Sequence, residues 1–337
     1  MRVALITGSR ADFNALYMVH KELCKYTKFQ PVLIRADHWQ LATPTDIAII
    51  CGDRYEMLEM AFKLNLNHIP IAHLAGGDLT EGSQDDCFRH AITKLSHIHF
   101  PTNHDAANRV LQMGEDPRHV HMVGSASLDL VLQTELLDRD ATFAAVGLKT
   151  PQRALLVSFH PNTLGDTAQE LRVLEAALRA WDGALVMVGP NRDQGWELIA
   201  ASFGALSANP NVVYAHNFEP KVYHSLMYWC DAMVGNSSAG VYEAPSFGTP
   251  VVNIGDRQSG RIKANCVTDC GPERVDIIAA IAWAVAMKRF PPENPYGDGH
   301  ASERIAKVLA SIDEPRLLLH KMWYDLQKTG SRQPKVA

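Results

Sequence analysis

The chain has 337 residues, 47% of them hydrophobic, which predicts about two domains with ample cores. Acidic residues outnumber basic ones by 37 to 32, and the net charge of −5 argues against nucleic acid as the main partner. No apolar run is long enough for a membrane span, and the first residues lack the apolar stretch of a signal peptide. We therefore expect a cytoplasmic protein without a membrane partner.

Short β-branched runs alternate with longer segments of helical period, a pattern typical of parallel sheets built from βα units. The first set of expected strands comprises Val3–Thr7, Ile47–Cys51, Ile69–Leu74, Ile98–Phe100 and Val120–Val123. The second set comprises Ala154–Ser158, Leu185–Val188, Val212–Tyr214, Ala232–Val234 and Pro250–Ile254. The polar stretch Asp138–Arg153 lies between the sets and is a candidate linker.

These patterns predict an α/β fold with two Rossmann-like domains of parallel sheet, residues 1–145 and 146–312. Within residues 313–337 we expect a C-terminal helix, Arg316–Leu326, that packs back on the first domain. Its apolar side is expected to carry Leu317, Leu318, Met322 and Trp323.

The six cysteines are scattered along the chain, and there is no Cys-x-x-Cys or His-rich pair with zinc spacing. We expect reduced thiols and no metal site.

In parallel sheets, loops at the carboxyl ends of strands bind ligands. One such loop, residues 235–240 (GNSSAG), joins an expected strand to a helix, where backbone N–H groups and the hydroxyls of Ser237 and Ser238 favour a phosphate. Glu243 follows one turn later and could accept both hydroxyls of a ribose, and Arg257 follows the next strand. An ordinary N-cap would explain Ser238 alone, but the combination indicates nucleotide binding.

The first loop, residues 8–12 (GSRAD), does not have the G-x-G-x-x-G pattern of a dinucleotide site, which disfavours a nicotinamide dehydrogenase. Arg10 could bind a substrate phosphate or pair with Asp12 at the surface, and the sequence favours neither.

Acidic residues gather after the second and third expected strands of the first domain. These residues are Asp53, Asp78, Glu81, Asp85 and Asp86. Carboxylates held together suit proton abstraction at carbon, although loop solvation or helix capping would account for most of them. Asp53 directly follows an apolar strand, and we interpret it as functional. A magnesium site is less favoured, because this acidic cluster offers no D-x-D pair and no obvious Walker-type lysine.

Two histidines follow strands of the second domain. His160 is followed by Pro161, which ends the strand, so its imidazole should face the crevice between the domains. His216 and Asn217 offer ring and backbone groups for a nucleotide base. By contrast, His90, His97 and His99 are interpreted as structural.

Taken together, these loops resemble the family of UDP-N-acetylglucosamine 2-epimerases, specifically its hydrolysing branch in sialic-acid-type sugar biosynthesis. In the first domain the matching stretches are 52–58 (GDRYEML), 69–73 (IPIAH), 76–78 (GGD), 85–86 (DD) and 89–97 (RHAITKLSH). In the second they are 160–161 (HP), 235–245 (GNSSAGVYEAP), 247–250 (FGTP), 255–261 (GDRQSGR) and 294–299 (NPYGDG).

The resemblance implies a GT-B-type fold, two Rossmann-like domains facing a cleft, and chemistry without metal or other cofactor. A carboxylate would remove the C2 proton of a UDP-sugar while UDP leaves C1, and water would then add to release the free 2-epimer, of N-acetylmannosamine type. Asp53 and Asp85 match acid/base positions and His160 the histidine of the cleft. The matching nucleotide-binding positions are Arg10, Ser237, Ser238, Glu243 and Arg257. A homo-oligomer, dimer or tetramer, is also implied.

Two departures from the family pattern bear on activity. Ala75 stands where a second catalytic glutamate is often found, so Asp78 or Glu81 would take that role. Only Arg35–Thr45 remain where family members have a few dozen more residues, which predicts a pared-down sheet and a more open sugar pocket.

Two other function classes remain as alternatives: a GT-B glycosyltransferase, which would need an acceptor, and a degenerate nucleotide-sugar binding protein. The sequence leaves the sugar open between N-acetylglucosamine and a 2,4-diacetamido-6-deoxy analogue, and the nucleotide open between UDP and GDP.

Overall fold

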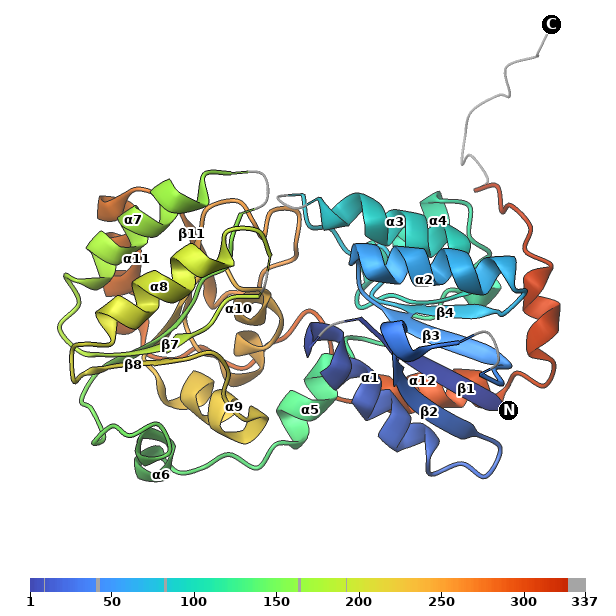
Figure 1. The fold of residues 1–337 in the computed structure, drawn as a ribbon, viewed down its shortest axis with the longest axis horizontal. Helices are drawn as coiled ribbons and strands as arrows, with labels where there is room; N and C mark the ends of the chain where they lie inside the picture. Colours follow the sequence, from blue (N-terminus) through green and yellow to red (C-terminus); the bar gives the residue numbers. More distant parts are fainter. Residues whose placement is uncertain (9, 41–42, 82–83, 163–164, 192, 327–337) are drawn as a thin grey trace, which may run out of the picture. The chain divides into compact units, whose positions relative to one another are not determined.

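The computed structural model describes all residues except 9, 41–42, 82–83, 163–164, 192 and 327–337, and also leaves out the side chains of Arg10 and Ala11 (Figure 1). The chain forms two compact units. The first comprises Met1–Asp78, Cys87–Ser125 and the described residues from Ser302 onward, and the second comprises Leu79–Asp86 and Ala126–Ala301. The sequence placed its boundaries at residues 145 and 312, whereas residues 126–145 are grouped with the second unit.

The first unit is built on a five-stranded parallel sheet with the order β2-β1-β3-β4-β5. The strands are β1 (Arg2–Thr7), β2 (Gln30–Arg35), β3 (Ile47–Cys51), β4 (Ile71–Leu74) and β5 (Ile98–Phe100). Apolar side chains on both faces of β3 are fully buried, as expected for a strand covered by helices on both sides. The strand expected at Val120–Val123 is wrong: Val120 makes only an isolated bridge to His99.

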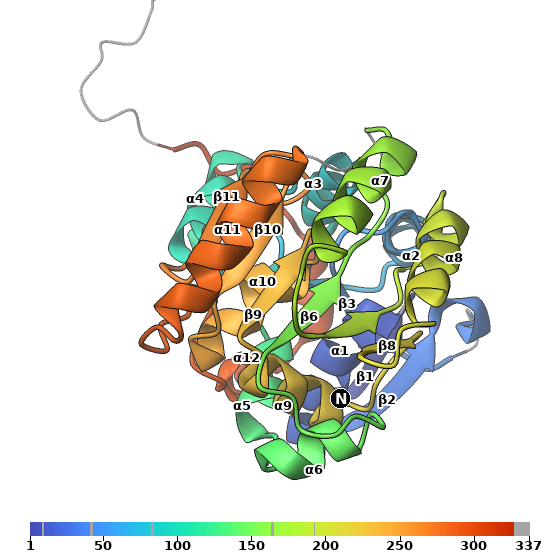
Figure 2. The same ribbon diagram turned by 90° about the vertical axis from the view of Figure 1, so that its left-hand side faces the viewer.

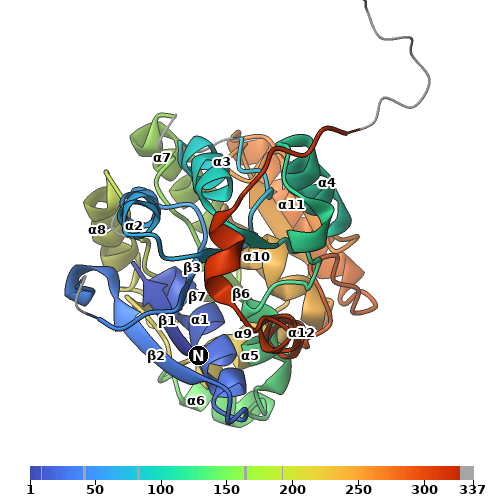
Figure 3. The same ribbon diagram turned by 90° about the vertical axis from the view of Figure 1, so that its right-hand side faces the viewer.

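Helices cover both faces of this sheet (Figures 1 and 3). Those on one face are α2 (Tyr55–Leu66), α3 (Asp85–Leu95) and α4 (His104–Gln112), and those on the other are α1 (Arg10–Leu23) and α12 (Ala301–Ala310). Two short 3-10 turns, η1 (Ala36–His38) and η2 (Pro117–His119), complete the connections. Residues 36–46 join β2 to β3, and among the described ones η1 is the only helical turn.

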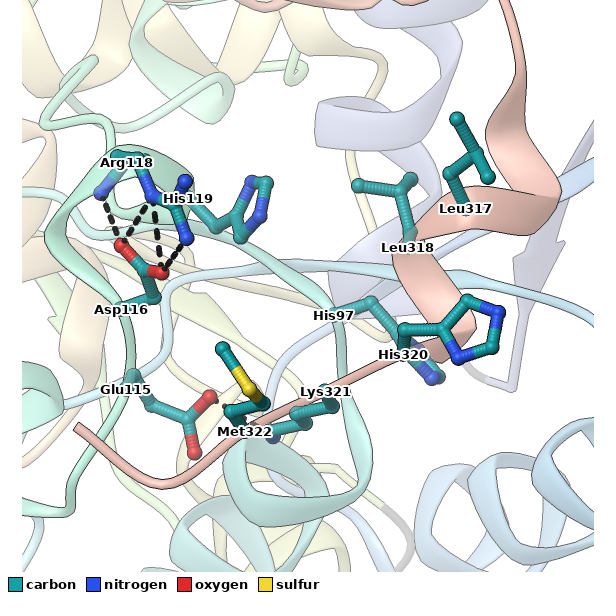
Figure 4. Close-up of a pocket in the computed structure, with 10 residues that line it drawn as sticks. All are labelled: His97, Glu115, Asp116, Arg118, His119, Leu317, Leu318, His320, Lys321 and Met322. Atoms are coloured by element: carbon teal, nitrogen blue, oxygen red, sulfur yellow. Dashed lines mark hydrogen bonds and ion pairs between the residues drawn. The ribbon is translucent and has the colours of Figure 1, made fainter.

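The C-terminal helix expected over Arg316–Leu326 is wrong. The structure has a 3-10 turn, η4 (Pro315–Leu319), followed by irregular chain, and Leu317, Met322 and Trp323 are 68%, 73% and 65% exposed. Polar contacts hold this segment on the first unit, together with the Trp323 ring, which lies against Gly114 and 4.4 Å from Lys94 Nζ. Lys321 Nζ donates to the carbonyl oxygens of Lys94, near the end of α3, and of Ser96, just after it, and pairs with buried Glu115 at 2.7 Å (Figures 3 and 4).

The second unit is built on a six-stranded parallel sheet with the order β11-β10-β9-β6-β7-β8. The strands are β6 (Ala154–Ser158), β7 (Ala184–Val188), β8 (Val212–Ala215), β9 (Ala232–Gly235), β10 (Val251–Ile254) and β11 (Val267–Cys270). The five strands expected here are confirmed to within a residue or two. The sixth, β11, has a mixed polar sequence that gave no strand signal.

Helices pack on this sheet in two layers with separate cores (Figure 2). One layer consists of α7 (Thr167–Leu178), α8 (Trp196–Leu206) and α11 (Arg274–Met287). The other consists of α5 (Ser127–Gln133), α6 (Arg139–Ala144), α9 (Pro220–Trp229), α10 (Ser238–Tyr242) and the 3-10 turn η3 (Ala244–Phe247).

The segment expected as a linker, Asp138–Arg153, is instead part of the second unit. It contains α6, and the side chain of Phe143 is fully buried in the same core as Leu128 and Val131 of α5. The predicted fold class, α/β with two Rossmann-like domains of parallel sheet, is confirmed. Within the described residues, no helix combines the length and apolarity needed to cross a membrane.

Candidate functional site

Each sheet contains one point at which the strand order reverses, and ligands of open α/β sheets bind at the carboxyl ends of the strands beside such a point. In the first unit it lies between β1 and β3, and in the second between β6 and β9. The loops that follow these four strands carry Arg10, Asp53, His160 and Ser237. The geometry of each unit is given separately.

In the second unit, His160 follows β6, and its side chain is buried (7% exposed). Its Nδ1 atom lies 3.0 Å from the backbone nitrogen of Asn191 and its Nε2 atom 3.3 Å from Ser237 Oγ. Because a backbone N–H can only donate, Nδ1 must be the acceptor and carries no proton. In a neutral ring the proton is then on Nε2, on the side of the ring that faces Ser237.

Asn236 locks the two strand ends together. Its Oδ1 accepts the backbone N–H of His160 at 2.7 Å, and its Nδ2 donates to the carbonyl oxygen of His160 at 2.9 Å. The preceding residue, Gly235, has φ +140°, and a Cβ there would collide with the carbonyl oxygen of Ser158. This close approach places the first turn of α10 directly beside His160.

The carbonyl oxygen of Asn236 is held by the next loop. Gln258 Nε2 and Arg257 Nη1 donate to it at 2.8 and 3.2 Å. Gln258 is fully buried and also accepts from Arg261 Nη1 at 2.6 Å. Arg257 therefore lies beside the phosphate-type loop, as its expected role requires.

Ser237 is the N-cap of α10, with Oγ 3.4 Å from the backbone nitrogen of Ala239, and Ser238 is exposed at the first helical position. Glu243 ends this helix with its side chain 23% exposed, and its Oε2 lies 3.7 Å from Nε2 of buried His224. Hydroxyls at the start and a carboxylate at the end of one short helix are suited to a phosphate and to vicinal hydroxyls.

The other two residues expected to bind the base lie at the end of β8. His216 and Asn217 are both exposed, and the His216 ring makes an edge contact with Trp196 at 6.3 Å between centroids. Strand β8 is at the edge of the sheet, two strands away from β6.

In the first unit, Asp53 lies just after β3 and forms an ion pair with Arg89 Nη2. Arg89 is 3% exposed, and its Nη1 donates to the carbonyl oxygen of Asp78 at 2.7 Å. The Asp53 carboxyl group is itself 21% exposed. A partly open carboxylate is thus fixed from behind by a buried guanidinium.

The other predicted acidic groups have different surroundings. The Asp78 side chain is 3% exposed, and its Oδ1 accepts from Thr102 Oγ1 at 2.7 Å and Asn103 Nδ2 at 3.3 Å. Asp85 is the first residue of α3 and is half-buried. Its spacing from Arg89 puts both residues on one face of that helix.

Three further positions were singled out from the sequence. Arg10 begins α1, but its side chain lies outside the described part of the structure. Glu81 is exposed. Ala75 has φ +61°, a left-handed conformation that is unfavourable for a residue with a Cβ, in the turn between β4 and Asp78.

Several residues of these networks escaped sequence reasoning as site residues, namely Arg89, Asn236, His224 and Gln258. Arg89, Asn236 and Gln258 each stand inside a matching motif, and the polar character of Asn236 in a buried strand-to-helix turn was a further signal. The buried position of His224 left none. Among the described residues, no group of three His, Cys, Asp or Glu is arranged to hold a metal ion.

Comparison with known proteins gives a consistent result. Residues 25–310 match the family model described as UDP-N-acetylglucosamine 2-epimerase. A Campylobacter jejuni protein named GDP/UDP-N,N'-diacetylbacillosamine 2-epimerase (hydrolyzing) is 36% identical over 230 residues, which are 66% of this chain and 60% of that protein. A Legionella pneumophila UDP-N,N'-diacetylbacillosamine 2-epimerase (hydrolyzing) is 32% identical over 82% of this chain and 74% of its own length.

Among solved structures, the UDP-GlcNAc 2-epimerase of Neisseria meningitidis bound to UDP-GlcNAc has a TM-score of 0.78 at 18% identity. The alignment covers 93% of this chain and 100% of that one. At this identity the likeness shows a shared fold. The chain spans about 60% of the length of its Campylobacter relative.

Proposed function

The chain belongs to the UDP-N-acetylglucosamine 2-epimerase family, and from this premise we propose that it is a hydrolysing 2-epimerase of a UDP-linked 2-acetamido sugar. The substrate is UDP-N-acetylglucosamine or its 2,4-diacetamido-6-deoxy analogue. The names of the Campylobacter and Legionella relatives give a diacetamido sugar, N,N'-diacetylbacillosamine. The products are UDP and the free 2-epimer.

The observation that carries the proposal is the Asp53 carboxylate, partly open at the end of β3 and backed by buried Arg89. In the proposed reaction this carboxylate takes the C2 proton while the bond between C1 and the diphosphate oxygen breaks. UDP leaves with the bonding electrons, and a 2-acetamidoglucal remains. Water then adds at C1, and Asp85 or Asp78 returns a proton to the opposite face of C2.

The second unit is proposed to hold the nucleotide. Ser237, Ser238 and Arg257 bind the diphosphate, Glu243 accepts the ribose hydroxyls, and His216 with Asn217 contacts the base. His160, whose Nε2 side faces Ser237, donates a hydrogen bond to the departing diphosphate. Arg10 is proposed as a further phosphate ligand. Since the mechanism uses only carboxylates, an imidazole and water, we propose that it needs no cofactor.

The proposal is tested by incubating the protein with UDP-N-acetylglucosamine in deuterated water and following the sugar by NMR. We expect release of UDP together with N-acetylmannosamine that carries deuterium at C2, because the transferred proton is replaced from solvent. Product without deuterium at C2 would exclude the elimination route. If the first substrate is inert, the same assay with the 2,4-diacetamido analogue and with GDP-linked sugars identifies the accepted donor.

A second candidate, a nucleotide-sugar binding protein without turnover, is favoured by one observation. By the resemblance, Ala75 stands where family members often carry a catalytic glutamate, and the turn of residues 75–77 has no carboxylate. This candidate predicts UDP-sugar binding by calorimetry with no UDP release from any donor. A glycosyltransferase, the third class considered, would release UDP only when an acceptor is added. The cytoplasmic location and the homo-oligomeric state stay predictions.

A further inference from the structure

A buried histidine of the first unit contacts the loop that carries Asp53. His73 lies on β4 with its side chain fully buried, between Ile50 of β3 and His99 of β5 in the sheet register. Its Nε2 atom lies 2.9 Å from the carbonyl oxygen of Gly52, the residue directly before Asp53. A carbonyl oxygen can only accept, so Nε2 of His73 carries the proton and donates it.

The other ring nitrogen connects His73 to helix α3. Nδ1 lies 3.2 Å from Thr93 Oγ1, and this hydroxyl also lies 3.0 Å from the carbonyl oxygen of Arg89. Arg89, one helical turn before Thr93, makes the ion pair with Asp53. Because Nδ1 and the Arg89 carbonyl oxygen can both only accept, the single hydroxyl proton of Thr93 is shared between them. The contacts close a ring of residues that runs from Gly52 through His73, Thr93 and Arg89 back to Asp53.

This ring restrains the candidate base at two points. Arg89 holds its carboxylate, and His73 holds the carbonyl oxygen that sets the direction of the chain into Asp53. Gly52 has φ +83°, which glycine adopts without strain. Glycine can also adopt many other backbone conformations, so this one is not fixed by the residue itself. The hydrogen bond from His73 to the Gly52 carbonyl oxygen restricts this backbone freedom.

Burial keeps the imidazole of His73 neutral. It lowers the pKa of His73 to about 3, so the imidazole carries a single N–H over the whole neutral range and cannot exchange protons with a substrate there. His73 is therefore suited to orienting its neighbours and not to acid/base chemistry.

We propose that His73 is a positioning residue for Asp53: it fixes the Gly52 carbonyl and, through Thr93, the helix turn that carries Arg89, so that the carboxylate is held ready for proton abstraction. The inference rests on the proposed function for its kinetic readout only. Its structural readout, the backbone amide of Asp53, is independent of any activity.

The test uses two substitutions of matched size. His73→Leu removes both ring nitrogens, whereas His73→Gln places an amide nitrogen near the position of Nε2 and can donate to Gly52. For His73→Leu we expect kcat for UDP release to fall about 100-fold, the cost of a misplacement of about 1 Å. KM and UDP affinity should stay within about 2-fold of the wild-type values, because this substitution removes no contact to substrate. We expect His73→Gln to recover most of the loss.

His99→Leu is the control for core damage. His99 is equally buried on the neighbouring strand, but its Nε2 contacts Glu115 at 2.8 Å and not the Asp53 loop. We expect this variant to lose stability without the drop in kcat. A His73→Leu enzyme with wild-type kcat, or one that loses no more than His99→Leu, would overturn the inference.

Amide NMR separates failure of this inference from failure of the proposed function. The Asp53 amide signal should shift or broaden in His73→Leu and return towards its wild-type position in His73→Gln, even if the wild-type protein releases no UDP. An Asp53 amide that is unmoved in His73→Leu overturns the positioning role whatever the activity. If His73→Leu does not fold, Thr93→Val removes the hydroxyl next to Nδ1, and the same amide readout applies to it with the same two outcomes.

Discussion

Asp53 and Arg89 form an ion pair between the loop after β3 and the buried face of α3, with the guanidinium 3% and the carboxyl group 21% exposed. The guanidinium is thus shielded by protein while one side of the carboxylate stays accessible. This difference in exposure between the two partners is absent from surface ion pairs such as Arg2–Asp46, in which both side chains face solvent.

The first prediction concerns this carboxylate. Asp53→Asn keeps the shape of the side chain but cannot accept a proton, so UDP release should fall by roughly 100- to 10,000-fold while UDP binding is retained. Asp46→Asn is the matched control, since Asp46 also pairs with an arginine, Arg2, but at the opposite end of the sheet. Wild-type turnover in Asp53→Asn would remove this residue from the mechanism.

The second prediction concerns His160. In His160→Asn, the amide oxygen can still accept the backbone N–H of Asn191, but the group next to Ser237 is lost. We expect UDP release to slow by about 100-fold or more, because stabilisation of the departing diphosphate is lost. The control is His68→Asn, at an exposed position with φ +55° that asparagine tolerates well, and it should leave the rate unchanged. Equal rates in the two variants would contradict the role.

The third prediction concerns nucleotide affinity. Glu243→Ala and Ser238→Ala each remove a polar contact of about 1 to 3 kcal/mol, so UDP affinity measured by calorimetry should fall about 5- to 150-fold in each. Ser207→Ala removes a hydroxyl that bonds only to its own helix, at Gly204, and serves as the control. Unchanged affinity in both test variants, with intact folding, would place the nucleotide elsewhere.

The fourth prediction concerns Ala75. Because Ala75 already has φ +61°, replacing it by glutamate adds little further backbone strain, and stability should change by less than about 1 kcal/mol. If the missing carboxylate limits turnover, Ala75→Glu should raise the rate of UDP release, whereas Ala75→Gln should not. Equal rates in wild type and Ala75→Glu would show that the present acidic groups suffice.

The fifth prediction concerns acid stability. Burial lowers the pKa of His73 to about 3 and that of His97 to about 4, so both rings are neutral in the folded state. The unfolded chain binds protons at both from about pH 6.5 downward, so the contribution to stability is complete above that pH and is lost as the pH falls towards the folded-state values. Urea midpoints should therefore decrease steadily from about pH 7 to about pH 4.5.

His97→Asn is the variant that checks this cause, because its amide oxygen can still accept the backbone N–H of Ile71, as Nδ1 of His97 does at 3.1 Å. It should flatten the decrease over the upper part of this range. A wild-type stability that is constant down to about pH 5 would show that the two rings do not titrate as buried groups.

Local patterns were sufficient for the inner strands of both sheets and for the loops after them, but they missed the edge strands β2 and β11. Apolar β-branched runs such as Ile47–Cys51 are stable only when both faces are buried, which predicts central strands of a parallel sheet. The polar residues that follow such strands lie at their carboxyl ends. For this reason Asp53, His160 and Ser237 could be placed at strand ends without a structure. The motif order was enough to name the family.

Only the tertiary structure decided which groups meet. Arg89 reaches Asp53 across 36 positions of chain, and His73 reaches Gly52 across 21, so neither contact has a local signature. The apolar spacing of Leu317, Met322 and Trp323 predicted a packed helix, but Lys321 and the buried carboxylate of Glu115 hold that segment as an irregular strap. Pairings of this kind depend on how distant segments pack, and short-range periodicity does not contain that information.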